Sequence, residues 1–398
     1  MLPTGEPSMR LAIALILSLS AASLARPAHA QSGFYTAPPG EIAAGKPGSL
    51  IRTEPMHGAP GNARAYRMLY RSVGLDGKPI AVSGVAVVPA GTAPPGGRPV
   101  VAWAHPTSGV QPQCAPSLSG GVFQTVQGLS DMLARGYIVT ATDYPGLGTP
   151  GPHPYLVGAS AGRSVVDSVR AVQQLPDAAA SRSFAVWGHS QGGHAALFTG
   201  LLARSIAPEL KLVGVAAAAP ATELATLLAD DIDTDGGRNL TAMTLWSWSR
   251  VYGAPMAQIV NEQATPIVND LAADCVESLR DVVLRLWPTR QLARRFLTDE
   301  NFGAREPWRT LLARNTPGVT PRGMPVYIAQ GTSDTLVRPQ VTRAYAQTLC
   351  RAGRAVQFDA LQGIGHLLAA RDSAATAVDW MDQRFRGEPA PNNCASLK

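Results

Sequence analysis

Charged residues are scarce in this chain of 398 residues, at 16% of the sequence, whereas hydrophobic residues make up 45%. Disordered chains and coiled coils need far more charge, so neither class fits, and the apolar share is enough for a large core. The net charge is only +6, and the sequence has no internal repeat, no basic run and no basic stretch interleaved with aromatics. We therefore predict a globular protein without a nucleic-acid partner.

Long apolar runs are missing beyond the N-terminus, which excludes a membrane-spanning helix further along the chain. Arg10 precedes an apolar stretch from Leu11 to Ala25, and Ala28-His-Ala30 forms a small-x-small cleavage site before Gln31. The stretch of about 15 residues is shorter than the roughly 20 needed to cross a bilayer. We therefore expect residues 1–30 to be a signal peptide, cleaved near Ala30, and the mature protein to be extracellular or periplasmic.

Cysteine is also rare, with four residues in the chain and no Cys-x-x-Cys pair that would suggest zinc. An even number of cysteines in an exported protein predicts two disulfides. The residues alone leave all three pairings open. The four are Cys114, Cys275, Cys350 and Cys394.

The hydrophobic pattern predicts an α/β fold with a mostly parallel sheet flanked by helices. After an extended lead-in at 31–60, two β-type segments are joined by a hairpin turn at Asp76-Gly77. Buried strands then alternate with helical stretches, as in parallel sheets. We expect strands at 65–72, 80–88, 100–103, 137–142, 184–187, 212–218, 326–329 and 355–358, and helices at 123–135, 158–174, 192–204, 339–352 and 372–386.

The alternation stops near Pro220 and resumes only near residue 321. Between these points the pattern is helical, with no convincing strand. We expect a helical cap at 221–320, inserted between a first core segment at 31–220 and a second at 321–398. Its expected helices are at 223–228, 259–271, 276–286 and 291–297.

The segment Gly188-His-Ser190-Gln-Gly192 matches the pattern of a nucleophile elbow, a tight turn that exposes a serine between a strand and a helix. The same pattern occurs around Ser160, in Gly158-Ala-Ser-Ala-Gly162. Ser190 directly follows an apolar strand and opens a helix, whereas Ser160 follows a loop. We therefore identify Ser190 as the nucleophile and interpret Ser160 as a helix N-cap.

A serine hydroxyl needs a base to take its proton, and the base needs an acid to orient it. His366 follows Gly363 and Gly365 in the loop between the last predicted strand and the last helix. Asp334 lies in the loop after the preceding strand, which fits the order serine, acid, histidine. Asp359 is nearer to His366 in sequence, but it lies within the strand or at its end. We favour Asp334.

The oxyanion of the tetrahedral intermediate needs two N–H donors. One is expected from Gln191, the residue after the nucleophile. The other is expected from the loop after the strand that ends at Trp103. Pro106 in that loop has no N–H, so the donor is Thr107 or Ser108, and the residues alone do not decide between them.

Two further patterns do not carry enough features to predict a cofactor. The stretch Gly146–Gly151 spells a dinucleotide fingerprint, but Pro145 and Pro150 interrupt it and the expected acidic residue is missing. The acidic stretch Asp230–Asp235 lacks the glutamate of a calcium loop and fits a solvated cap loop. We expect neither cofactor nor metal.

Taken together, these motifs resemble the secretory lipase family, the lipase-A type of α/β-hydrolase. The resemblance rests on the elbow at Ser190, on Cys114-Ala-Pro-Ser117, on Asp143-Tyr-Pro-Gly-Leu-Gly148, and on the loops that hold Asp334 and His366. It covers the chain from about residue 35 onward. It implies hydrolysis of triacylglycerols or simpler esters, a cap over an acyl tunnel, and the disulfides Cys114–Cys275 and Cys350–Cys394.

We therefore predict a secreted serine esterase or lipase that hydrolyses acylglycerol-type esters through an acyl-enzyme on Ser190. The substrate would be a small-molecule or lipid ester, with transient contact to a lipid surface; the oligomeric state stays open. The alternatives are an exported acyltransferase or peptidase of the same fold, or a non-catalytic binding protein. Candidate acyl contacts in the cap are Leu245, Trp246, Trp248, Leu286 and Trp287.

Overall fold

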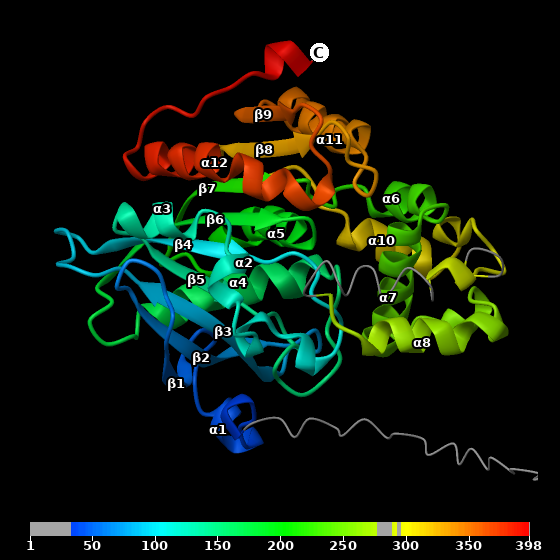
Figure 1. Ribbon diagram of the computed structural model, residues 1–398, viewed down its shortest axis with the longest axis horizontal. Coiled ribbons are helices and arrows are strands. Elements are labelled where there is room, and N and C mark those ends of the chain that lie inside the picture. Colours follow the sequence, from blue (N-terminus) through cyan, green and yellow to red (C-terminus); the bar gives the residue numbers. More distant parts are fainter. Residues whose placement is uncertain (1–32, 277–288, 293–295, 398) are drawn as a thin grey trace, which may run out of the picture. The chain divides into compact units, whose positions relative to one another are not determined.

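The computed structural model describes residues 33–276, 289–292 and 296–397. These residues contain one sheet of nine strands in the order β1-β2-β3-β5-β4-β6-β7-β8-β9 (Figure 1). The pairs among β1, β2, β3 and β5 are antiparallel, and all pairs from β5 through β4 to β9 are parallel. The strands are β1 (Leu50–Met56), β2 (Arg64–Val73), β3 (Pro79–Val88), β4 (Arg98–Ala104), β5 (Ile138–Thr142), β6 (Ala180–His189), β7 (Lys211–Ala218), β8 (Val326–Gly331) and β9 (Val356–Leu361).

Helices cover both faces of the sheet, so its central strands are buried on two sides. Every residue of β5 and β8 is buried, which is consistent with the mainly apolar sequences of these strands. One face packs against α4 (Gly158–Val172), α5 (Gln191–Ile206) and α11 (Pro339–Arg351), and the other against α2 (Val122–Thr125), α3 (Leu129–Ala134) and α12 (Ala369–Phe385). The prediction of a mostly parallel sheet flanked by helices is confirmed.

The sequence prediction differs from the structure in two parts of the core. The expected helix at 123–135 is divided into α2 and α3, because Gly128 has a φ of 80° and interrupts the helical path. The lead-in expected at 31–60 contains the short helix α1 (Pro39–Ala43) and the edge strand β1. Pro55 lies within β1, and proline in a strand favours an edge position because it cannot donate to a neighbour.

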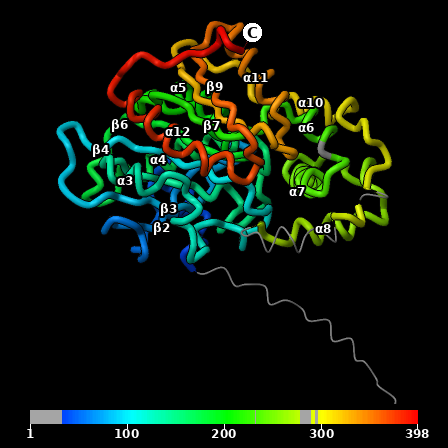
Figure 2. Tube along the Cα trace, turned by 45° about the horizontal axis from the view of Figure 1, so that its top comes forward, coloured from blue at the N-terminus to red at the C-terminus, as the bar shows by residue number. Residues whose placement is uncertain are grey.

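Between β7 and β8, the described residues form helices and an isolated bridge between Val260 and Leu297, but no strand. The α-helices are α6 (Leu224–Asp231), α7 (Asp235–Val251), α8 (Thr265–Ala273) and α10 (Trp308–Asn315). Figures 1 and 2 show them grouped at one side of the sheet. They share an apolar cluster that also includes Tyr155 and Val337 from the sheet-bearing part of the chain.

The acidic stretch Asp230–Asp235 is not the solvated loop that the sequence suggested. It contains the end of α6 and the beginning of α7, a helix of 17 residues that the sequence pattern did not predict. The hydroxyl of Thr234 caps α7 by accepting a hydrogen bond from the N–H of Gly237. Glycines 236 and 237 in the first turn conceal the helical pattern, since glycine disfavours helices. Most of the helix expected at 276–286, and part of that at 291–297, lie outside the described residues.

None of the helices in the described part of the chain is long and apolar enough to cross a membrane.

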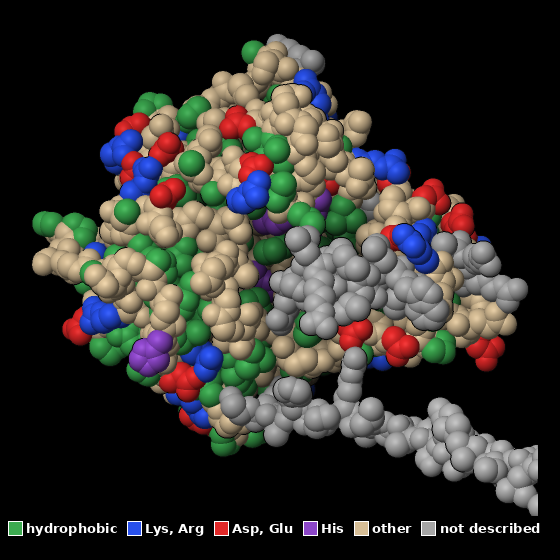
Figure 3. Space-filling model, viewed as in Figure 1, with side chains coloured by type: hydrophobic (Ala, Val, Ile, Leu, Met, Phe, Trp, Pro, Cys, Tyr) green, Lys and Arg blue, Asp and Glu red, His purple; other side chains and the backbone are tan. Residues whose placement is uncertain are grey.

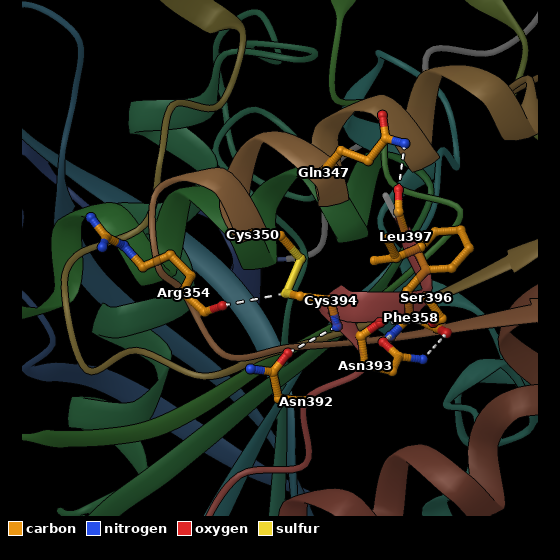
Figure 4. The surroundings of a disulfide bond; sticks show 9 residues. All are labelled: Gln347, Cys350, Arg354, Phe358, Asn392, Asn393, Cys394, Ser396 and Leu397. Atoms are coloured by element: carbon orange, nitrogen blue, oxygen red, sulfur yellow. Dashed lines mark hydrogen bonds between the residues drawn. A yellow bond between two sulfur atoms is a disulfide. The ribbon is translucent and has the colours of Figure 1, made fainter.

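The C-terminal segment is attached to α11 by a disulfide and to the edge strand β9 by side-chain hydrogen bonds (Figure 4). Cys394 is bonded to Cys350 of α11. The amide of Asn393 accepts from the N–H of Phe358 at 2.9 Å and donates to its carbonyl at 2.8 Å. Asn393 therefore pairs with β9 as a neighbouring strand would, and occupies groups that an open sheet edge would leave free.

Replacing both Cys350 and Cys394 with serine is expected to lower the free energy of unfolding. The bond closes a loop across 44 residues, for which the chain-entropy estimate is about 4 kcal/mol. Guanidinium unfolding of the oxidised protein and of the C350S/C394S variant measures the difference. Equal unfolding free energies would contradict the stabilising role of this disulfide.

Candidate active site

Ser190 occupies a strained turn between β6 and α5. Its backbone angle φ is 57°, a value that residues other than glycine rarely adopt. The two neighbouring glycines are required by space: a Cβ on Gly188 would lie 2.1 Å from the carbonyl oxygen of Gly192, and a Cβ on Gly192 would lie 1.9 Å from that of Ala104. The close backbone packing at both glycines holds the serine at the end of the sheet, at the N-terminus of α5.

Three residues that are far apart in sequence form one chain of hydrogen bonds. The hydroxyl of Ser190 donates to Nε2 of His366 at 2.8 Å, and Nδ1–H of His366 donates to Oδ2 of Asp334 at 2.8 Å. All three residues are buried. They meet because β6, β8 and β9 run parallel, so that the loops after these strands lie at the same sheet edge.

Asp334 is held as an ionised hydrogen-bond acceptor. Its Oδ1 accepts from the N–H groups of Leu336 at 2.9 Å and Val337 at 2.8 Å, and its Oδ2 from the amide of Gln330 at 3.0 Å. Burial by itself raises the pKa of Asp334, but the hydrogen bond and the charge of His366, together with the backbone donors, bring it below its usual value. The carboxylate can therefore orient the imidazole and stabilise its protonated form.

The alternatives considered from the sequence occupy other places. Asp359 lies within β9, and its carboxylate is within 3.4 Å of the Gln357 amide rather than at His366. Ser160 is not the N-cap that we expected: α4 begins at Gly158 with Val157 as its N-cap, and Ser160 is buried in the first turn. In each pair of candidates, the residue that is hydrogen-bonded to His366 is Asp334 or Ser190.

The loop after β4 brings Thr107, rather than Ser108, to the site. Thr107 lines the same cavity as Ser190, and its hydroxyl is 2.8 Å from that of Tyr155. The carbonyl of Ser108 accepts from the N–H of Val276 at 2.8 Å, beside the Cys114–Cys275 disulfide. Gln191 is the first residue of α5, where backbone N–H groups have no partner within the helix.

Ser190 and His366 open onto a cavity of about 530 Å³. Figure 3 shows histidine side chains in a hollow near the centre of one face, with hydrophobic side chains beside them. The lining is mainly apolar, with polar groups from α2 and from the first turns of α7. The apolar lining residues are Trp103, Pro106, Leu240, Val276, Leu336, Leu367, Leu368 and Ala370.

The acyl contacts proposed from the sequence do not line this cavity. Leu245, Trp246 and Trp248 are instead buried in the apolar cluster of the insertion, which is the helical part of the chain between β7 and β8. Leu286 and Trp287 lie outside the described residues. Leu240 and Leu336 were not predicted as cavity residues, because they belong to segments about 100 residues apart and carry no motif. Because the helix α7 was not predicted from the sequence, the side of α7 that lines the cavity could not be predicted.

A family model for secretory lipases matches residues 120–393. The chain belongs to the secretory lipase family. It is 25% identical to Lipase 10 of Candida albicans, over 96% of this chain and 86% of that one. The structure of Candida antarctica lipase A in its closed state superposes with a TM-score of 0.74 at 20% identity, over 91% of this chain and 89% of that one. A rice cell wall degrading esterase, LipA from Xanthomonas oryzae, gives 0.70 at 22% identity, over 87% and 100%.

The family makes this chain a carboxylic ester hydrolase of the lipase or esterase type, with an α/β-hydrolase fold, as we predicted. The two disulfides join Cys114 to Cys275 and Cys350 to Cys394, the pairing that the family resemblance implies. The first of them ties the loop after β4 to the insertion. Among the described residues, no cluster of histidine, cysteine and acidic side chains could hold a metal ion.

The hydrogen-bonded chain of Ser190, His366 and Asp334 is called the relay. Four further histidines of this secretory lipase are buried in the same part of the protein. His189 precedes Ser190, and its Nε2–H donates to the carbonyl of His366 at 2.9 Å. Burial, with the nearby charge of His366, lowers the pKa of His189 to about 3. Burial likewise lowers the pKa of His153 to about 3, that of His194 to about 4, and that of His105 in the same direction. These rings are neutral when the protein is folded at neutral pH.

Stability is expected to fall as the pH decreases below about 6.5, where the unfolded histidines take up protons that the folded protein excludes. The contribution is complete above that pH and is lost progressively down to the folded pKa values of about 3 to 4. Each such group adds a slope of up to about 1.4 kcal/mol per pH unit. Guanidinium unfolding at a series of pH values between 7.5 and about 5 measures this slope.

The variant His194→Gln provides the matched comparison. His194 donates from Nε2 to the carbonyl of Asn315 at 2.7 Å, and a glutamine amide can donate in the same way without titrating. The free energy of unfolding of this variant should change less steeply with pH, because one histidine no longer titrates. The contributions of the other groups cancel when the two proteins are compared. Identical slopes in the two proteins would show that His194 titrates alike when folded and unfolded.

Proposed function

We propose that Ser190, His366 and Asp334 hydrolyse carboxylic esters through an acyl-enzyme on Ser190. The observation that carries the proposal is the pair of 2.8 Å hydrogen bonds in series, from the serine hydroxyl to the imidazole and from the imidazole to the carboxylate. The relay is buried on one side and open to the cavity on the other, so an ester can reach Ser190 while the imidazole stays oriented.

In the first half-reaction, Oγ of Ser190 attacks the ester carbonyl while Nε2 of His366 takes the hydroxyl proton. Asp334 stabilises the imidazolium, and His366 then gives the proton to the departing alcohol. In the second half-reaction, water attacks the acyl-enzyme and loses its proton to the same nitrogen. The carboxylic acid is released, and Ser190 regains its hydroxyl.

The oxyanion is assigned to the backbone N–H groups of Gln191 and Thr107. Gln191 begins α5, so its N–H is unused by the helix and the helix dipole favours negative charge there. Thr107 is preferred to Ser108 because it lines the cavity together with Ser190. Pro106, the residue before it, cannot donate.

The cavity fits an ester with an apolar acyl or alcohol group, such as an acylglycerol or a simpler ester. Leu367 and Leu368, which line it, are 59% and 39% exposed and supply apolar surface beside the base. Such surface supports a transient contact with a lipid interface. We further propose that the insertion at 221–320 acts as a cap, because α7 contributes Asn239 and Leu240 to the cavity wall.

Ser190→Ala is expected to lower kcat on p-nitrophenyl esters by about 10⁴- to 10⁶-fold, because the nucleophile is lost. Ser160→Ala is the matched control, since Ser160 lies in the second Gly-x-Ser-x-Gly segment, is buried in α4 and does not line the cavity of Ser190. A fluorophosphonate probe should label the Ser160→Ala variant and not the Ser190→Ala variant. A series of esters of graded acyl length, with an aminoacyl anilide beside it, then reports chain preference and separates esterase from peptidase.

The same assay tests the choice of carboxylate. Asp334→Asn is expected to lower kcat by about 10⁴-fold, because the amide no longer fixes the reactive tautomer. Asp359→Asn is expected to leave kcat within about twofold, since this carboxylate does not contact His366. Retained activity in Ser190→Ala, or the reverse order of the two carboxylate variants, would overturn the proposed relay.

We also propose export with cleavage of the signal peptide near Ala30. The family is a secretory one, which supports export, and the small-x-small site at Ala28-His-Ala30 supports the position. Intact-mass measurement and N-terminal sequencing of protein recovered outside the cytoplasm should give a chain that begins at Gln31. A mature chain that retains the apolar stretch from Leu11 to Ala25 would contradict cleavage.

A further inference from the structure

A short segment between β5 and α4 is bonded to the insertion on one side. The hydroxyl of Ser247, on α7, donates to the carbonyl of His153 at 2.6 Å and accepts from the N–H of Tyr155 at 3.0 Å. The indole N–H of Trp248 donates to the carbonyl of Tyr155 at 2.9 Å. Ser247 and Trp248 are fully buried, so water does not compete for these bonds. The backbone from 153 to 155 is therefore fixed by α7.

On its other side, this segment is bonded to the two residues that carry the proposed oxyanion donors. The hydroxyl of Tyr155 lies 2.8 Å from the hydroxyl of Thr107. Nε2 of His153 lies 3.0 Å from the side-chain amide nitrogen of Gln191. His153 and Tyr155 are each only 1% exposed. Each donor residue thus has its side chain tied to the same three-residue segment.

The ring of His153 is in the state that this arrangement needs. Nδ1–H donates to the carbonyl of Pro145 at 2.8 Å, which leaves Nε2 free to accept from the Gln191 amide. Burial lowers the pKa of His153 to about 3, so the ring stays neutral over the range in which ester hydrolysis is assayed. The contact to Gln191 therefore does not change with protonation near neutral pH.

We propose that Tyr155 and His153 are positioning residues that hold the oxyanion donors at Thr107 and Gln191, and that α7 supports them through Ser247 and Trp248. The inference rests on the proposed function of Ser190. It assigns the insertion a part in the rate of reaction, in addition to its part in the cavity wall. No residue of α7 needs to touch the reacting atoms for this effect.

The expected signature is a loss of kcat with little change in KM. Oxyanion bonds form fully only in the transition state, so a displaced donor slows the reaction without weakening substrate binding. Removal of one donor costs about 10²- to 10³-fold. A donor that is misplaced rather than absent should cost less, and we expect a fall in kcat of about 10- to 100-fold.

Tyr155→Phe removes only the hydroxyl that contacts Thr107. Its matched control is Tyr345→Phe, because Tyr345 is similarly buried, at 3%, and its hydroxyl donates to the carbonyl of Gly318 at 3.0 Å. Each variant loses one buried hydroxyl, so the unfolding temperature should fall by a similar amount in both. On p-nitrophenyl butyrate, only Tyr155→Phe should show the loss of kcat, with KM within about twofold.

A double-mutant cycle identifies the contact responsible. Thr107→Val keeps the backbone N–H and removes the side-chain hydroxyl that Tyr155 holds. If the two hydroxyls act only through each other, Tyr155→Phe combined with Thr107→Val should lower kcat no further than either change alone. His153→Phe, which removes the acceptor for the Gln191 amide, should lower kcat independently of that pair.

The contribution of the insertion is tested on α7 itself. Ser247→Ala is expected to lower kcat in the same manner as Tyr155→Phe, whereas Ser249→Ala is expected to leave it unchanged. The hydroxyl of Ser249 donates to the carbonyl of Trp246 within the same helix and makes no contact with the segment at 153–155. Far-ultraviolet circular dichroism and thermal unfolding establish that each variant is folded.

Unchanged kcat in folded Tyr155→Phe and Ser247→Ala, additive losses in the cycle, or a change in KM alone would overturn the inference. If Tyr155→Phe does not fold, Thr107→Val and Ser247→Ala decide by the same criteria. Failure of the proposed function looks different, because Ser190→Ala would then keep its activity. An inactive Ser190→Ala beside a fully active Tyr155→Phe rejects only the positioning role.

Discussion

The close backbone approach of α5 to the end of β4 is the constraint on which the site depends. The carbonyl of Ala104 lies where a Cβ on residue 192 would be, so only glycine allows the contact. This contact places the turn of Ser190 beside the loop that carries Thr107. One steric requirement thus brings the nucleophile and both proposed oxyanion donors together, and the parallel strands β8 and β9 then bring Asp334 and His366 to the same edge.

Two of the motifs that indicate the family, Cys114-Ala-Pro-Ser117 and Asp143-Tyr-Pro-Gly-Leu-Gly148, have a structural role. The carboxylate of Asp143 is buried and accepts from the N–H of Ser117 at 2.9 Å and from the hydroxyl of Ser83 at 2.6 Å, with a further bond from the Ser117 hydroxyl. Burial raises the pKa of Asp143, and these donors oppose the rise. The bonds join the end of β5 to the loop of Cys114, which the disulfide to Cys275 ties to the insertion. These two motifs therefore stabilise the loops that surround the relay.

The sheet could be predicted largely from the sequence, because its central strands are buried on both faces and appear as short, mainly apolar runs. The edge strand β1 and the helix α7 were missed for local reasons. Pro55 and the surrounding polar residues conceal β1, and the glycine pair in its first turn conceals α7. Their stability comes from contacts with β2 and with the apolar cluster of the insertion, which local preferences do not encode.

The sequence by itself predicted the succession of β2 to β9 along the chain, the serine at the elbow, and the acid and histidine expected in the two later loops, because each depends on short patterns next to apolar runs. Only the tertiary structure decided which loop residue faces the cavity, which side chains line it, and that His153 and Tyr155 join α7 to Thr107 and Gln191. Those contacts link segments about 40 to 90 residues apart. Nothing in the local sequence specifies them, since they arise only when distant elements pack against one another.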